Sequence, residues 1–222
     1  MSHRDIGHRA TRGIAPWLIA VALVGAPGTG LRAQGIVDSA STDNLPPGKG
    51  QLSLSNLRLQ LSYNSLQVVF IPLDERVLRL LTGDSYRALE ATIASYRHQI
   101  DSVTSFTGVT QPGIALVSFL ALAPNVRFDP QLVTLVFHGQ QVRPIGWVAI
   151  SANFSNQQLQ VRDQVQAILV YARDIPVREG FTLSYVTAAN DDWQNRLPRF
   201  DAERARILGS IHGRPDTTGG GH

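Results

Sequence analysis

The sequence predicts a mainly β protein of the α+β class: an antiparallel β-sandwich, Ig-like in its general architecture, with one inserted amphipathic helix. Short apolar runs of β type recur along the chain, with turn residues between them at roughly ten-residue intervals. Residues 84–104 have the apolar spacing of a helix instead. Strand and helix patterns do not alternate regularly, which argues against a doubly wound parallel sheet. An outer-membrane barrel is a weaker alternative, because the helical segment takes the place of strands that a barrel needs.

The first 33 residues have the pattern of a signal peptide. Arg4, Arg9 and Arg12 precede a ten-residue apolar run at 17–26, and Ala33 supplies a small residue before the expected cleavage site. An uncleaved membrane anchor is the alternative, but a helical span needs about twenty apolar residues. We therefore expect a secreted or periplasmic protein that has no membrane span once the signal is removed.

The charge of the mature chain is expected to be balanced. The whole sequence has 20 Lys and Arg residues against 17 Asp and Glu residues, but residues 1–33 hold four of the arginines and one of the acids. The remaining chain therefore has 16 of each, so the basic precursor is no argument for nucleic acid as a partner. The absence of cysteine excludes disulfides, thiolate metal sites and a cysteine nucleophile.

We expect one folded domain after the signal. Residues 34–50 are polar and rich in Ser, Asp, Gly and Pro, which predicts a disordered linker. Residues 51–208 then form a single β-sandwich domain, and residues 209–222, which end in DTTGGGH, form a disordered tail. A folded part of this size can be held together by one hydrophobic core.

The centre of the domain is predicted at residues 113–151. Residues 114–123 form an apolar run bounded by Pro-Gly and Pro-Asn, which predicts a strand buried on both faces. Residues 132–137 and 142–150 are two further β-type runs, and the segment HGQQ at 138–141 predicts a hairpin turn between them. We therefore expect three consecutive strands at the centre of the fold.

Other segments are assigned from the same signals. Residues 57–61 and 66–72 predict a hairpin that turns at Tyr63-Asn64-Ser65, and residues 165–172 and 181–187 predict a second strand pair joined by a long turn over 174–180. Three segments have weaker patterns: residues 73–81 fit a short helix or the end of a strand, residues 152–164 a loop or an edge, and residues 200–208 a short C-terminal helix capped by Asp201.

The helix at 84–104 is the strongest helical prediction. Asp84 or Ser85 is the expected N-cap, and Gly108 lies just beyond the end, where glycine stops helices. One apolar stripe recurs at intervals of three and four residues and comprises Tyr86, Leu89, Ile93, Tyr96, Ile100 and Val103.

No motif in the sequence indicates catalysis. Between residues 51 and 212 the histidines are His98, His138 and His212, and no two are spaced as a metal-binding pair. The sequence has neither a G-x-S-x-G nucleophile motif nor a glycine-rich phosphate loop after a strand. We expect no catalytic residue, no metal site and no cofactor.

The most suggestive polar cluster spans residues 190–196, after a predicted strand. Its candidate ligand-binding residues are Asp191, Asp192, Trp193 and Arg196. A sugar or peptide stacking on Trp193, with an aspartate accepting hydrogen bonds, is one interpretation, and a calcium ion held by oxygen ligands is another. We favour a structural interpretation, in which Trp193 covers the sheet edge and the acids solvate a turn.

These observations favour an exported, non-catalytic binding or interaction module of the cell envelope. The expected partner is an envelope protein or a surface polymer, and nucleic acid is not expected. One alternative is a hydrolase of envelope polymer that uses scattered acids such as Asp191 or Asp192. The other is a small-ligand carrier with an apolar pocket between the helix at 84–104 and the sheet.

Overall fold

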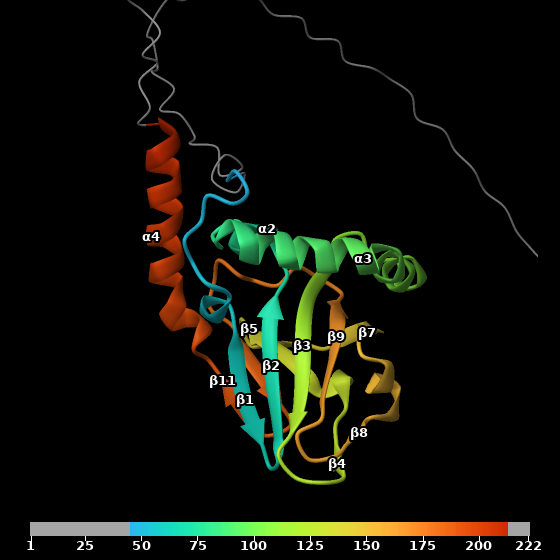
Figure 1. Cartoon of the computed structure of the whole chain (residues 1–222). Helices are drawn as coiled ribbons and strands as arrows, with labels where there is room; N and C mark the ends of the chain where they lie inside the picture. The colour runs from blue at the N-terminus through green and yellow to red at the C-terminus, as the bar shows by residue number, and fades with distance from the viewer. Residues whose placement is uncertain (1–44, 213–222) are drawn as a thin grey trace, which may run out of the picture. The chain divides into compact units, whose positions relative to one another are not determined.

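The computed structural model describes residues 45–212. The predicted signal peptide (1–33), most of the predicted linker and most of the predicted tail lie outside the described residues. The described chain belongs to the α+β class, with several antiparallel sheets, a helix of 25 residues and a helix at its C-terminal end (Figure 1).

The largest sheet has five strands in the order β1-β2-β3-β9-β7, and every neighbouring pair is antiparallel. Its strands are β1 (Leu59–Tyr63), β2 (Leu66–Pro72), β3 (Gly113–Ala121), β9 (Gln164–Tyr171) and β7 (Pro144–Ala149). The strand predicted at 114–123 is therefore confirmed as the central strand β3, and the hairpin predicted from 57–61 and 66–72 is confirmed as β1–β2.

The remaining strands form a four-stranded and a two-stranded sheet. The first has the order β11 (Ala188–Asn190), β10 (Thr182–Tyr185), β5 (Val133–Phe137) and β6 (Gln140–Val142). The second pairs β4 (Val126–Arg127) with β8 (Gln158–Leu159). Three 3-10 helices connect strands or precede them: η1 (Leu54–Asn56), η2 (Pro130–Leu132) and η3 (Ala152–Asn156).

The prediction of three consecutive central strands was wrong. The run at 142–150 divides at Arg143: Val142 ends β6, which pairs with β5, while Pro144 begins β7, which pairs with β9 in the other sheet. Proline has no backbone N–H to continue a ladder, so the chain changes sheets at this point.

The predicted pairing of 165–172 with 181–187 was also wrong. These segments are β9 and β10, and they belong to different sheets. Apolar alternation shows which face of a strand is buried, but it does not identify the neighbouring strand.

The two larger sheets contact each other through aromatic side chains. Phe70 of β2 packs with Phe181, just before β10, at 6.2 Å between ring centroids, and Phe119 of β3 packs with Tyr185 of β10 at 6.2 Å. The hydroxyl of Tyr171 in β9 donates to the carbonyl of Val133 in β5 at 3.1 Å, which satisfies a polar group inside this apolar layer.

Helix α3 (Gly83–Thr107) runs across the ends of β2, β3 and β9 in the five-stranded sheet (Figure 1). Its N-cap is Thr82, slightly before the Asp84 or Ser85 that we predicted. It ends as predicted at Gly108, whose φ of 70° is left-handed and favours glycine. The short helix α2 (Glu75–Leu78) precedes it, so the helical alternative for residues 73–81 holds in part.

Helix α4 (Trp193–His212) is much longer than the helix predicted at 200–208. It includes Pro198 and begins inside the polar cluster at 190–196, where we expected a turn. The chain is also ordered earlier than Gln51, where we expected structure to begin, because Leu45 is already buried against the core.

Candidate functional site

The predicted cluster at 190–196 lies where β11 leads into α4. Asp191 and Asp192 are exposed, and Asp192 exchanges two hydrogen bonds with the side chain of Asn190. Trp193 is 0% exposed, its ring lies 5.1 Å from those of Phe181 and Phe200, and its Nε1 donates to the carbonyl of Val177 at 3.2 Å. The indole therefore faces the core, where no external sugar or peptide stacks on it.

Arg196 and Asn190 cover the outer edge of β1. Arg196 donates to the carbonyl oxygens of Asn56 at 3.0 Å and Arg58 at 2.8 Å, while Asn190 Nδ2 donates to the carbonyl of Gln60 at 2.8 Å. Burial lowers the pKa of the Arg196 guanidinium, as desolvation disfavours its charge. Two of the residues that suggested a site in the sequence thus satisfy backbone groups of an edge strand.

The next turns of α4 bind the N-terminal end of the described chain. Glu203 is 8% exposed and accepts from the backbone N–H of Gln51 at 2.6 Å, while Arg206 donates to Glu203 and to the carbonyl of Lys49 at 2.7 Å. The hydrogen bonds from Arg206, and next the N–H of Gln51, hold the pKa of Glu203 below its ordinary value despite its burial. Glu203 and Arg206 therefore have a structural role: they hold α4 against the N-terminal end of the described chain.

A different arrangement exists at the opposite edge, where α3 meets β7. A helix of 25 residues is about 37 Å long, whereas five strands span about 20 Å from first to last. The last two turns of α3 accordingly lie beside β7, the outermost strand, where Phe106 projects from the helix outside the buried apolar stripe.

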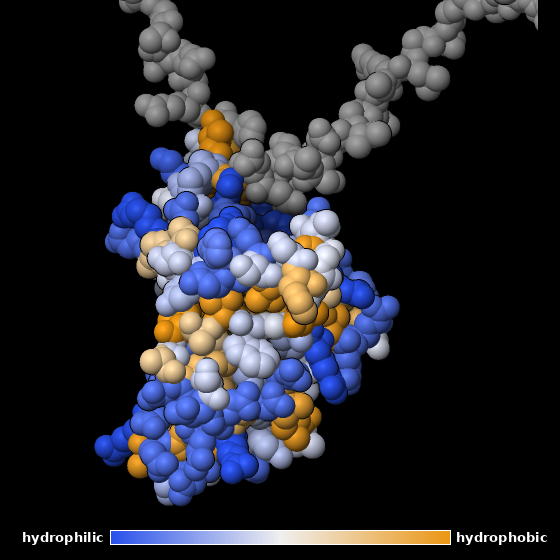
Figure 2. Space-filling model, turned by 90° about the vertical axis from the view of Figure 1, so that its right-hand side faces the viewer, coloured by the Kyte–Doolittle hydropathy of each residue, from blue (hydrophilic) through white to orange (hydrophobic). Residues whose placement is uncertain are grey.

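An open groove of about 420 Å³ lies between the end of α3 and β7. Phe106 at its rim is 94% exposed, and apolar side chains gather across the middle of this face of the molecule (Figure 2). Gly146 lets the helix approach, because a Cβ there would lie 2.7 Å from Cγ1 of Val103. We call this the α3–β7 groove, and its lining is uncharged: Ser102, Val103, Phe106, Thr107, Ile145, Gly146 and Trp147.

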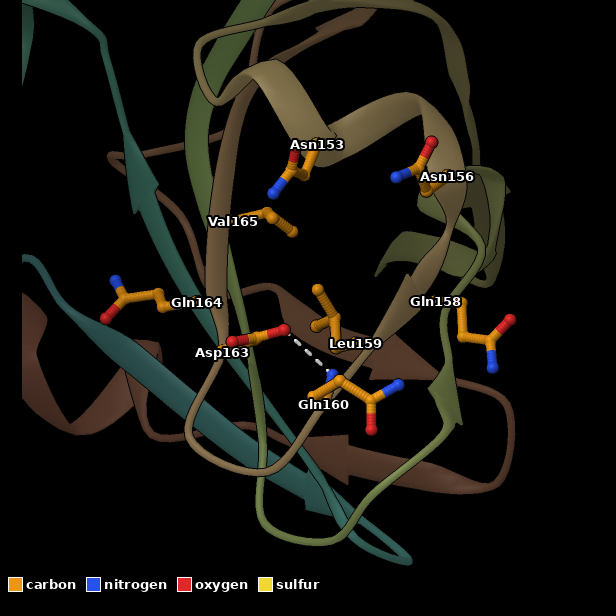
Figure 3. Close-up of a pocket in the computed structure, with 8 residues that line it drawn as sticks. All are labelled: Asn153, Asn156, Gln158, Leu159, Gln160, Asp163, Gln164 and Val165. Carbon is orange, nitrogen blue, oxygen red and sulfur yellow. Dashed lines mark hydrogen bonds between the residues drawn. The ribbon is translucent and has the colours of Figure 1, made fainter.

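A second concavity, the amide pocket, has about 480 Å³. Asn153 and Asn156 of η3 point into it together with Leu159 and Val165, which form an apolar floor (Figure 3). Its other lining residues are Gln158, Gln160, Asp163 and Gln164. Amides above an apolar floor offer both donors and acceptors for a neutral polar ligand.

The histidines and acids do not gather into a metal site within residues 45–212. His98 lies exposed on α3, and His138 lies on the β5–β6 turn with its Nε2 3.0 Å from a carboxylate oxygen of Glu179. The side chain of His212 lies outside the described residues. Neither long helix of the described part has the apolar character that a membrane crossing requires.

Comparison of the chain with family models, with curated proteins and with solved structures finds no match. The functional assignment therefore depends on the geometry of the molecule. The sequence analysis included an apolar pocket between the helix at 84–104 and the sheet as one alternative, but it did not identify β7 as the neighbouring strand or Phe106 as a lining residue. One signal was present: Phe106 lies within the helix, because Gly108 places the helix end after it.

Proposed function

We propose that the protein is an exported, non-catalytic binding module of the cell envelope, secreted or periplasmic, whose α3–β7 groove binds an apolar segment of a partner protein. The N-terminal signal pattern supports export, and the balanced charge of residues 34–222 is consistent with a partner other than nucleic acid.

The observation that carries this proposal is the exposed apolar end of α3. Phe106 is 94% exposed beside a groove with no charged lining residue. Burying a phenylalanine side chain contributes about 1.5–3 kcal/mol, so a partner that covers Phe106 gains a substantial part of its binding free energy there. An uncharged lining favours an uncharged apolar segment, because a charge buried in it would lack a partner.

The finer architecture belongs to the same proposal. We propose that the two larger sheets form the Ig-like β-sandwich expected from the sequence, and the aromatic contacts of Phe70 and Phe119 with the β10 region support it. In such a sandwich α3 is an addition to the five-stranded sheet, which is where the groove forms.

The test is a selection from a phage-displayed library of random twelve-residue peptides on the purified protein. Affinities of the enriched peptides are then measured by fluorescence anisotropy for the wild type, for Phe106→Asp and for a matched control. Leu122→Asp is the control, since Leu122 is also an exposed apolar residue (55%) but lies at the end of β3. We expect Phe106→Asp to weaken binding at least tenfold and Leu122→Asp to leave it unchanged; equal binding by all three proteins contradicts the proposal.

A second candidate function is the binding of a neutral saccharide of a surface polymer in the amide pocket. The inward-pointing amides of Asn153 and Asn156 favour it, since amides donate to and accept from sugar hydroxyls (Figure 3). A glycan array probed with the wild type and with Asn156→Ala tests it. Binding of a defined glycan that the variant loses supports this function, and an array without signal excludes it for the glycans printed.

A further inference from the structure

The β7 strand has an open hydrogen-bonding edge. The N–H of Ile150 donates to Gln166 of β9 at 3.0 Å, and backbone groups alternate in direction along a strand. Counting back by this alternation, Gly146 and Val148 face β9, whereas Trp147 and Ala149 face away from it; the count stops at Gly146, because the register shifts between Pro144 and Gly146.

No strand of the described chain pairs with those outward positions. β7 is the last strand of its sheet, and within residues 45–212 no hydrogen bond joins the outward N–H and C=O groups of Trp147 and Ala149 to another residue, although η2 and η3 lie near β7. The opposite edge differs, because the outward carbonyl of Gln60 in β1 accepts from Asn190 and that of Arg58 accepts from Arg196.

The open edge and the apolar groove coincide. The groove is lined by Ile145 and Trp147 of this edge, and by Val103 and Phe106 of the helix that passes over Gly146. A chain lying along β7 would therefore bond to its backbone and at the same time place every second side chain against the end of α3.

We propose that the occupant of the groove is an extended apolar segment of a partner protein that adds to β7 as a further strand. Its backbone bonds to Trp147 and Ala149, and its alternate side chains cover Phe106 and Val103. This inference rests on the proposed function, because it specifies how the partner binds in the same groove. Peptides that bind should alternate between apolar residues, which face α3, and residues of any character.

In the register centred on Trp147, a second copy of the protein fits this edge less well than a single segment. Antiparallel pairing of two β7 strands centred on Trp147 places the two Gly146 residues about 7 Å apart along the strands. The two α3 helices pass over those glycines, and packed helices need roughly 8–10 Å between their axes. A single extended segment carries no such helix, so this clash does not arise.

The decisive variant is Ala149→Pro. It removes one outward N–H and leaves the groove lining intact, and proline is tolerated in edge strands where the N–H faces outward. Ala149→Val is the matched control, since it keeps the N–H at the same exposed position. With peptides from the phage selection as probe, we expect about tenfold weaker binding for Ala149→Pro and an unchanged affinity for Ala149→Val.

Hydrogen exchange of the wild type provides a second measurement that needs no variant. Bound peptide should slow exchange of the amides of Trp147 and Ala149 at least tenfold. If Phe106→Asp abolishes binding but neither Ala149→Pro nor the exchange rates respond, strand addition is wrong while groove binding stands. If no peptide binds at all, both proposals fail. If sedimentation shows a dimer that Ala149→Pro dissociates, the occupant is a second copy and the inference is overturned.

Discussion

At the β1 edge of the five-stranded sheet, side chains of Asn190 and Arg196 bond to the outward carbonyl groups, and α4 begins directly beside them. At the β7 edge no hydrogen bond within the described chain joins the outward groups of Trp147 and Ala149 to another residue, and the end of α3 lies beside this edge. One edge is closed by polar residues from a distant part of the sequence, and the other is bordered by an apolar groove.

The difference shows how a residue type can mislead. Charged and amide residues after a strand made residues 190–196 the candidate ligand-binding cluster, although we favoured a structural role, and Asn190 and Arg196 bond to the backbone at the closed edge. The open edge has no unusual residue types. It differs from the closed edge only because of its position as the last strand of the sheet, beside the end of α3. We therefore expect substitutions at the closed edge to change stability and substitutions at the open edge to change binding.

Trp193→Ala, at the start of α4 next to the closed β1 edge, should have the largest effect on stability. This side chain is fully buried between Phe181 and Phe200, and its removal leaves a cavity and an unpaired carbonyl at Val177. We expect the free energy of unfolding, measured by urea denaturation, to fall by about 4 kcal/mol. A loss below about 1 kcal/mol would mean that the indole is not part of the core, and the comparison would break down.

Arg196→Met tests the closure of the β1 edge itself. Methionine keeps much of the aliphatic stem but cannot donate to the carbonyls of Asn56 and Arg58. We expect a loss of about 1–2 kcal/mol in urea denaturation and faster aggregation by light scattering, as an uncovered edge strand pairs with other chains. Arg199→Met, an exposed position on the same helix, is the control and should change neither quantity.

Glu203→Gln tests the attachment of α4 through its pH dependence. The folded pKa of Glu203 lies below its ordinary value, so its contribution is present above that value and is lost as the pH falls through the folded pKa. We expect the variant to be less stable than the wild type by about 1 kcal/mol at pH 7, with the difference disappearing at acidic pH below about 4. A difference that is the same at pH 7 and pH 3 would contradict this assignment.

Phe106→Ser should have the smallest effect on stability. The side chain is almost fully exposed, so we expect the free energy of unfolding to change by less than about 0.5 kcal/mol in urea denaturation. The same variant should lose the binding of selected peptides. A large loss of stability would show that Phe106 packs within the fold. The β7 edge would then be bordered by packed side chains, as the β1 edge is.

The sequence by itself determined the local elements that depend on neighbouring residues. The central strand β3, the β1–β2 hairpin and the helix that ends at Gly108 follow from apolar periodicity and turn chemistry. These features can be predicted because each depends on residues that are close in the sequence: the hairpin and the helix end on local hydrogen bonds and turns, and the central strand on one continuous apolar run.

The tertiary structure alone decided which strands pair and what the polar cluster does. The separation of β9 from β10 into two sheets, and the role of Arg196 at an edge 138 residues earlier in the chain, depend on contacts that no periodicity encodes. The open β7 edge likewise depends on tertiary structure. Whether an edge strand is covered depends on the length of α3 relative to the sheet and on where α4 packs, and both are properties of the assembled fold.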